Sequence, residues 1–356
     1  MNTQQQQQLS GALTRILGLC FCAILVVVAL TFGADAQDLE TRFLRIGTGS
    51  PGGTYFPIGN AIAEAISAPI DTVDCSGNDD ACVAGLMAVA RASFGAVENL
   101  ANVRNGLIES GFVQSDLAHW ATHGEALYEE AGPTAEFRAI AGLYPELLHI
   151  VVPADSAITS PADLEGRRVS LGPDGSGTLI DAQLVLSTYG LEVGDVEKRN
   201  LTFEAAADAL RKGEIDAFFA IGGVPLPAIT DLSEVFPIRI LSLDDWAIDA
   251  LTEKHPFLSR EAVDMSAYGL EDVDSVAVEA IWLTTDKVPD DIIYEVTRAL
   301  WQSSTRQALA AAHPVADYSD GARPQCLSIP LHPGAERFYR EAGALCHQAQ
   351  LGQVTN

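Results

Sequence analysis

The sequence has little positive charge. Its 356 residues contain 21 Lys and Arg against 48 Asp and Glu, which gives a formal net charge of −27. Because affinity for nucleic acid comes largely from Lys and Arg on phosphates, nucleic acid is not an expected partner. We interpret the acidity as a solubility feature. An anionic ligand would need a local site that overcomes the overall negative field.

Cysteine is also sparse, and its spacing does not fit a metal site. No pair among the four cysteines beyond the N-terminal region has the two-to-four-residue spacing of zinc ligands, and the seven histidines are scattered, so no metal is expected. An even set in an exported chain predicts two disulfides. Local pairing is the simplest of the three connectivities, all of which remain open. It would join Cys75 to Cys82 and Cys326 to Cys346.

Catalytic motifs are missing as well. The segment GTGSPGG lacks the trailing lysine of a phosphate-binding P-loop, and the serine of GPDGSGT lacks the G-x-S-x-G spacing of a hydrolase. No histidine can be assigned as a base for that serine. We therefore expect neither an enzyme nor a cofactor.

The N-terminus carries a long apolar run. Ile16 to Gly33 is apolar and is followed by the small residues Ala34 and Ala36, which predicts a secretory signal comprising residues 1–36. An uncleaved anchor is the alternative, since 18 apolar residues lie at the lower limit for spanning a bilayer. Either way, the remainder of the chain leaves the cytoplasm.

Beyond this segment, short apolar runs alternate with helical patterns. The strand-like FLRI precedes a stripe of Ile58, Ile62 and Ile66, and LLHIVVP reads as a buried strand bounded by prolines. Such alternation predicts an α/β fold with mostly parallel sheets. Three strand ends lead into loops rich in glycine or hydroxyl groups. These loops are 47–55, 172–178 and 221–227. Because helix N-termini present unpaired amides, converging loops of this kind predict a site for a carboxylate or phosphate.

Five segments, in order, carry a resemblance to a known family. They are GTGSPGGTYFPIGNAIA, VENLANVRNGLIESGFVQSDLAHWA, DLEGRRVSLGPDGSGT, GEIDAFFAIGGVPLPAI and IPLHPGAERFYRE. Their order and spacing resemble the TAXI family, the extracytoplasmic solute receptors of tripartite ATP-independent periplasmic (TRAP) transporters. The resemblance covers nearly the whole chain after the signal.

The resemblance implies a type II periplasmic-binding-protein fold, with two α/β lobes around a ligand cleft. Lobe I would comprise 37–150 and 279–356, and lobe II would comprise 151–278. It also implies a periplasmic receptor that captures glutamate, glutamine, 2-oxoglutarate or a related small carboxylate and delivers it to a membrane permease. A ligand-sensing protein that signals to another partner is the alternative function, because fold alone does not separate the two.

The resemblance also indicates which residues line the cleft. The family's motifs fall on Ser50, Gly53, Thr54, Tyr55, Asn99, Gln114, Ser115, Asp116, Ser176, Gly177, Thr178, Gly222 and Gly223. Several have structural alternatives, since Tyr55 can be a packing aromatic and Asp116, Ser176 and Thr178 can cap helices.

One segment departs from the family pattern. Where the family has T-G-G-S, this chain has Ser93, Phe94, Gly95 and Ala96, with Arg91 just upstream. A phenylalanine here is expected to reshape the pocket, and Ser93 remains a candidate contact. The Arg91 guanidinium could pair bidentately with a carboxylate, or it could be a solvated charge. The neighbouring insertion CSGNDDAC is expected at or near the cleft rim.

Overall fold

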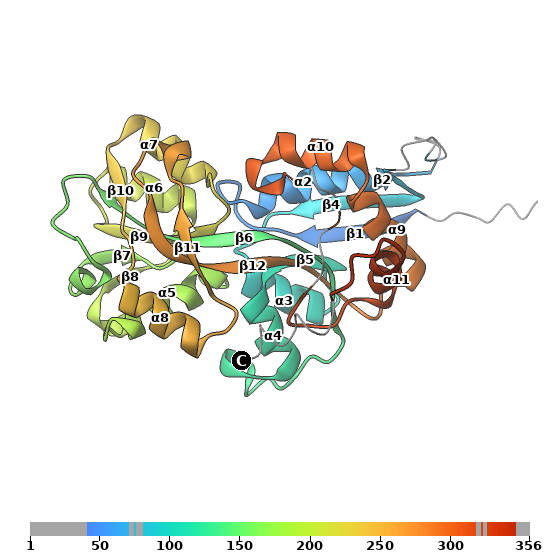
Figure 1. Ribbon diagram of the computed structural model, residues 1–356, viewed down its shortest axis with the longest axis horizontal. Helices are drawn as coiled ribbons and strands as arrows, with labels where there is room; N and C mark the ends of the chain where they lie inside the picture. Colours follow the sequence, from blue (N-terminus) through green and yellow to red (C-terminus); the bar gives the residue numbers. More distant parts are fainter. Residues whose placement is uncertain (1–40, 71–74, 76–80, 318–321, 323–325, 347–356) are drawn as a thin grey trace, which may run out of the picture. The chain divides into compact units, whose positions relative to one another are not determined.

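The computed structural model describes residues 41–70, 75, 81–317, 322 and 326–346 (Figure 1). The predicted signal segment lies outside these residues. The strands belong to one twelve-stranded sheet. Its strands are β1 (Arg42–Gly47), β2 (Ser67–Ala68), β3 (Val83–Ala84), β4 (Leu86–Arg91), β5 (Ser110–Gln114), β6 (Phe137–Pro153), β7 (Arg168–Ser170), β8 (Glu197–Arg199), β9 (Ala217–Gly222), β10 (Ile238–Ile240), β11 (Ser259–Val263) and β12 (Val273–Thr285).

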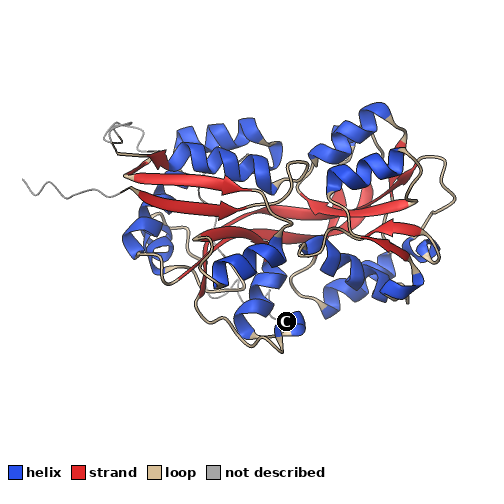
Figure 2. Cartoon of the chain, turned by 180° about the vertical axis from the view of Figure 1, so that it is seen from behind, coloured by secondary structure: helices blue, strands red, loops and turns tan. Residues whose placement is uncertain are grey.

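Helices cover both faces of this sheet (Figure 2). The α-helices are α2 (Tyr55–Ile66), α3 (Ala96–Arg104), α4 (Ser115–His123), α5 (Gly177–Thr188), α6 (Phe203–Arg211), α7 (Pro227–Val235), α8 (Asp245–Lys254), α9 (Asp290–Leu300), α10 (Ser303–Ala312) and α11 (Pro333–Glu341). Short 3₁₀ helices are η1 (Ala126–Tyr128), η2 (Pro161–Leu164), η3 (Val193–Asp195), η4 (Ser266–Tyr268) and η5 (Pro314–Ala316).

The first strand and helix show how the apolar pattern builds the core. Leu44 and Ile46 alternate on β1 and are buried, and the predicted stripe of Ile58, Ile62 and Ile66 on α2 belongs to the same apolar cluster. Each such side chain contributes roughly 1.5–3 kcal/mol on full burial. The helix begins at Tyr55, so the preceding glycine-rich loop leads directly into its N-terminus.

The sheet has two halves with the same strand order. In the first half, β4, β1 and β5 are parallel and β12 lies antiparallel beside β5. In the second half, β8, β7 and β9 are parallel and β6 lies antiparallel beside β9. The long strands β6 and β12 pair with each other and run through both halves (Figure 1). This α/β architecture of two halves joined by crossing strands confirms the predicted fold class.

Two details of the predicted sheet were wrong. Parallel pairing of strands is confined to β4–β1–β5, β8–β7–β9 and the short pair β2–β3, whereas β6 and β12 pair antiparallel with each other and with all their other neighbouring strands. The buried strand also does not stop at Pro145, since β6 continues through it and pairs Pro145 with Glu279. The register shifts between Glu279 and Ile281, beside this pair. Proline is tolerated in a strand at such an irregularity because it has no N–H to donate to the ladder.

Each half has apolar cores on both faces of the sheet. In the first half, one core includes residues of α2, α9, α10 and α11 and the other includes residues of α3 and α4. In the second half, α6 and α7 contribute to one core and α5 and α8 to the other. These cores hold in place the four helices that contribute residues to the candidate site, which are α2, α3 and α4 in the first half and α5 in the second.

Candidate ligand-binding site

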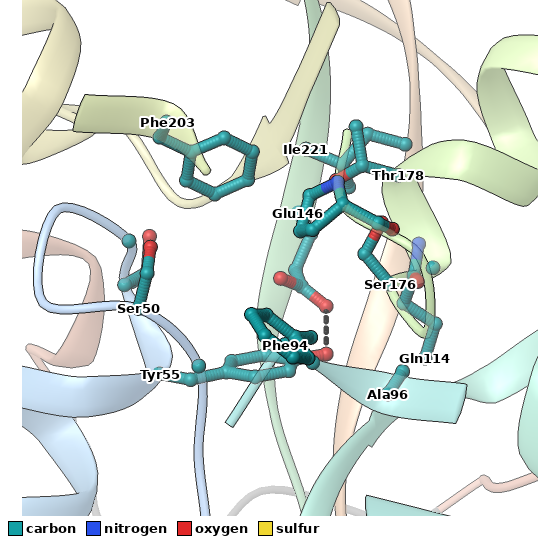
Figure 3. A pocket seen from close by; sticks show the side chains of 16 residues that line it. Ser50, Tyr55, Phe94, Ala96, Gln114, Glu146, Ser176, Thr178, Phe203 and Ile221 are labelled. Atoms are coloured by element: carbon teal, nitrogen blue, oxygen red, sulfur yellow. Dashed lines mark hydrogen bonds between the residues drawn. The ribbon is translucent and has the colours of Figure 1, made fainter. Parts of the chain in front are cut away.

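A cavity lies where the two halves meet, with about 480 Å³ of space between atoms including its opening (Figure 3). Both halves and the crossing strand β6 contribute to its walls. The lining residues are Gly49, Ser50, Gly53, Thr54, Tyr55, Phe94, Gly95, Ala96, Gln114, Glu146, Pro173, Ser176, Gly177, Thr178, Phe203 and Ile221. The part of this space that water molecules can enter is about 50 Å³.

Three helices begin at this cavity. Tyr55 starts α2, Ala96 starts α3 and Gly177 starts α5, and all three residues line the cavity. The first amides of a helix have no acceptor within the helix, and its N-terminus carries a partial positive charge. The hydroxyl of Ser176 accepts the Leu179 amide at 3.1 Å, whereas α2 and α3 have no side-chain cap. The cavity therefore offers several oriented donors to an anion.

The floor of the cavity has the opposite character. Glu146 on β6 is 3% exposed, and one of its carboxyl oxygens accepts the Tyr55 hydroxyl at 2.6 Å. Figure 3 shows the other oxygen turned toward the middle of the cavity. Burial raises the pKa of Glu146 well above its usual value, and the negative charges of Asp116 and Glu279 raise it further. Glu146 therefore binds its proton more tightly than an exposed glutamate does, and in its protonated form the O–H can donate a hydrogen bond.

Behind this floor lie two more buried carboxyls. Asp116 comes from α4 in the first half and Asp181 from α5 in the second half. Gln114 lines the cavity and donates its amide N–H to Asp181. Burial raises the pKa of Asp116 to about 6, and burial together with the Asp116 charge raises the pKa of Asp181.

Polar contacts tie the two halves together around the cavity. The hydroxyl of Thr54 accepts the Gly223 amide at 2.9 Å, and the Glu98 amide donates to the Gly175 carbonyl at 3.0 Å. Gly52 is held from the second half by two groups, its amide donating to Glu204 and its carbonyl accepting the Ala228 amide at 3.1 Å. The halves are thus in a closed arrangement.

Eight residues predicted from the sequence line the cavity. They are Ser50, Gly53, Thr54, Tyr55, Gln114, Ser176, Gly177 and Thr178. Ser176 is also the N-cap of α5, so the predicted capping role and a place in the cavity coincide.

Three predicted contacts lie outside the cavity, namely Arg91 and Ser93 from the departing segment and Asn99 from the family motif that follows it. Arg91 is exposed and, with Arg45, lines a separate surface groove. Ser93 hydrogen-bonds to the Thr48 carbonyl at 2.8 Å. The Asn99 amide donates to the carbonyls of Thr48 and Phe112 at 2.7 and 2.8 Å, so this side chain fixes backbone.

Four others lie next to the cavity without lining it. The Ser115 carbonyl accepts the Ser328 hydroxyl at 2.9 Å. Asp116 lies in the first turn of α4 but does not cap it. Gly222 and Gly223 pack against Thr54, and a side chain at Gly222 would come within 2.8 Å of the Thr54 hydroxyl oxygen.

The sequence reasoning missed Glu146, Asp181 and Phe203. Glu146 had a visible signal, because it is an acidic residue inside the apolar run YPELLHIVVP. An acid in a buried strand is rare without a partner or a function. Asp181 and Phe203 carried no comparable signal, since both fall on helices with ordinary patterns.

The disulfides have the local connectivity. Cys75 is bonded to Cys82 and Cys326 to Cys346, which confirms the simplest of the three pairings. Most of the insertion between the first two cysteines lies outside the described residues.

None of the described helices is long and apolar enough to cross a bilayer.

Comparison with solved structures finds several binding proteins at low identity. The periplasmic aliphatic sulphonate binding protein of Escherichia coli is similar with 17% identity and a TM-score of 0.42, covering 87% of this chain and 91% of that one. The alkanesulfonate-binding protein of Xanthomonas axonopodis pv. citri has 17% identity and a TM-score of 0.45, with coverage of 88% and 90%. A putative L-cystine transporter protein of Listeria monocytogenes has 12% identity and a TM-score of 0.45, with coverage of 78% and 97%. Residues 46–343, which include every cavity-lining residue, match the NMT1-like family, and the chain belongs to that family.

Proposed function

We propose that the chain is a periplasmic solute-binding receptor of the TAXI type, which captures a small carboxylate such as glutamate, glutamine or 2-oxoglutarate and delivers it to a TRAP membrane permease. The observation that carries this proposal is the convergence of three helix N-termini from both halves on one cavity. Membership of the NMT1-like family and the ordered TAXI motifs support it. The role is binding and release, without chemistry on the solute.

The backbone amides of Tyr55, Ala96 and Gly177 would hold the carboxylate. Such an anion site needs no cationic side chain, because aligned amides and helix dipoles supply the positive potential. No Lys or Arg side chain lines the cavity among the described residues. Phe94 and Phe203 would contact the apolar part of the solute, which limits its size.

In this proposal the two halves act as lobes, with lobe I formed by 37–150 and 279–356 and lobe II by 151–278. The solute would stabilise the closed arrangement only if it binds that arrangement more tightly than the open one. The contacts of Thr54 and Gly52 with the second half would form on closure. The permease would then recognise the closed, loaded receptor.

A thermal-shift screen followed by calorimetry tests this function. The purified protein is heated with L-glutamate, L-glutamine or 2-oxoglutarate, and at least one is expected to raise the melting temperature, since a ligand at 100 times its Kd adds about 2.7 kcal/mol of stability. Ser50→Trp, which fills the cavity, is expected to abolish the shift. Ser187→Trp, on the exposed face of α5, should preserve it. A shift that survives Ser50→Trp would contradict the proposed site.

A further inference from the structure

Three buried carboxyls lie at the floor of the binding cavity and behind it, each from a different part of the fold. Asp116 is 2% exposed on α4, Glu146 is 3% exposed on β6, and Asp181 is 4% exposed on α5. Asp116 belongs to the first half and Asp181 to the second, so the contact between them exists only when the halves are together.

No positive charge in the described part of the chain compensates these carboxyls. The groups that face them are Tyr55 from α2, Tyr128 from η1 and Glu279 from β12, together with the other members of the cluster. Among the described residues, no Lys, Arg or His forms an ion pair with any of the three. Glu146 and Asp181 also share a second cavity whose other lining residues are all apolar. Two ionised carboxylates in such surroundings would be very costly.

The hydrogen bonds of Asp116 and Asp181 point to a missing donor. Among the described residues, both carboxyl oxygens of Asp116 and Oδ1 of Asp181 are buried without a well-oriented donor, although the Asp116 and Leu117 backbone amides lie close to the Asp116 carboxyl. The remaining oxygen of Asp181 accepts from Gln114. Gln114 is the N-cap of α4, two positions before Asp116, so its bond to Asp181 brings the two aspartates from the different halves close together. Because an ionised carboxylate has no proton to donate, a direct hydrogen bond between the two groups requires a proton on one of them.

We propose that Asp116 and Asp181 share one proton across the two halves, so that closure around the solute takes up a proton from solution. In the open form the two side chains are apart and each is an ionised carboxylate. On closure one proton from water binds one carboxyl oxygen, and the resulting O–H donates to the other carboxylate. No other bond forms or breaks. This inference rests on the proposed function, because it requires that the halves close on a solute.

Gln114 connects the proton site to the binding cavity. Its side chain lines the cavity, its amide N–H donates to Asp181, and its carbonyl oxygen lies against Gly177 at the start of α5. A solute held by the α5 N-terminus therefore fixes the same helix that carries Asp181. The direction of the effect follows from the raised pKa of both aspartates. The closed form binds more protons than the open form, so solute affinity is highest in acid and falls as pH rises.

The test is calorimetric titration at pH 5, 6 and 7 in pairs of buffers that differ in ionisation enthalpy, which reports the protons taken up per solute bound. The probes are L-glutamate, L-glutamine and 2-oxoglutarate. For each proton taken up, Kd is expected to rise by up to about tenfold per pH unit.

Asp181→Asn should take up about one proton fewer than the natural protein and show a correspondingly shallower pH dependence of Kd. Asp116→Asn is the second variant and should behave in the same way. Asp231→Asn, exposed on α7, is the matched control and should keep the natural proton uptake.

Unchanged proton uptake in both Asp181→Asn and Asp116→Asn would overturn the shared proton while leaving the proposed function intact. If none of the three probes binds at any pH, the proposed carboxylate function fails instead. The shared proton is then tested on the protein alone by solution X-ray scattering at pH 5 and pH 8. A smaller radius of gyration at pH 5, lost in Asp181→Asn and kept in Asp231→Asn, would support it. Equal radii at both pH values would overturn it.

Discussion

The walls and the floor of the cavity differ in electrostatic character. The walls present the N-termini of α2, α3 and α5, whose amides and dipoles favour negative charge. The floor presents Glu146, with Asp116 and Asp181 behind it, and would repel negative charge if these groups were ionised. Under the proposed function, this acidic protein attracts an anion through backbone amides alone, provided that the Glu146 carboxyl on the floor is protonated.

The largest expected effect comes from removing the ionisable group of the floor. The Glu146 carboxyl binds its proton more tightly in the folded protein than in the unfolded chain, because burial raises its pKa. Its contribution to stability therefore falls as pH rises above the ordinary pKa of glutamate, by about 1.4 kcal/mol per pH unit. Glu146→Gln should flatten the decline in the free energy of unfolding between pH 5 and pH 7, measured by urea denaturation.

Glu64→Gln is the control for this measurement, since Glu64 is exposed on α2. Its pH profile should follow that of the natural protein. If Glu146→Gln also gave a parallel profile, Glu146 would be ionised in the folded protein and the neutral floor would be ruled out.

A smaller effect is expected at the point where wall and floor meet. Tyr55→Phe removes the hydroxyl that donates to Glu146 and leaves a buried carboxyl oxygen without that donor. A loss of about 1–3 kcal/mol in the free energy of unfolding is expected. Tyr128→Phe is the matched control, because the buried Tyr128 hydroxyl has no hydrogen-bond partner, and it should cost little. Equal losses in the two variants would show that the Tyr55 hydroxyl has no special role.

A still smaller effect is expected from removing the hydrogen bond that joins the two halves at Thr54. Thr54→Val keeps the shape of the side chain but removes the oxygen that accepts the Gly223 amide from the other half. Losing this bond is expected to weaken solute binding about fivefold, corresponding to about 1 kcal/mol. Thr230→Val removes a hydroxyl that bonds only within α7 and should leave Kd unchanged. Calorimetry on the tightest-binding of the three carboxylates measures both. An unchanged Kd for Thr54→Val would exclude this bond from closure.

The smallest effect is expected at Arg91. Its side chain is exposed and lies outside the cavity, so Arg91→Ala should leave the Kd of a carboxylate within about twofold of the natural value. A tenfold loss, measured by the same titration, would mean that the guanidinium reaches the solute and that the walls do not act through amides alone.

The sequence predicted the walls better than the floor. The helical stripe of α2 and the glycine-rich loops are local patterns, and local patterns determine where a helix begins. The structure places Thr54, Tyr55 and Ser176, which come from two of these loops, in one cavity. The positions of Asn99 and Arg91 depend on how β4 and β5 pair with β1, which no local pattern specifies.

The floor depends on contacts between distant parts of the chain. Asp116 and Asp181 are 65 positions apart in the sequence. They come together only because the first half, which contains α4, packs against the second half, which contains α5. Glu146 lies at the centre of a strand that runs past Pro145, where a proline suggested an end. Long-range packing of this kind leaves only one trace in the sequence, which is the acid within an apolar run.

The most direct test of the account is a crystal structure of the protein with the carboxylate that gives the largest thermal shift. The account predicts carboxylate oxygens within 2.7–3.2 Å of the amide nitrogens that begin α2, α3 or α5, with no Lys or Arg side chain in contact. A carboxylate bound to an arginine, or bound outside the cavity between the halves, would contradict it.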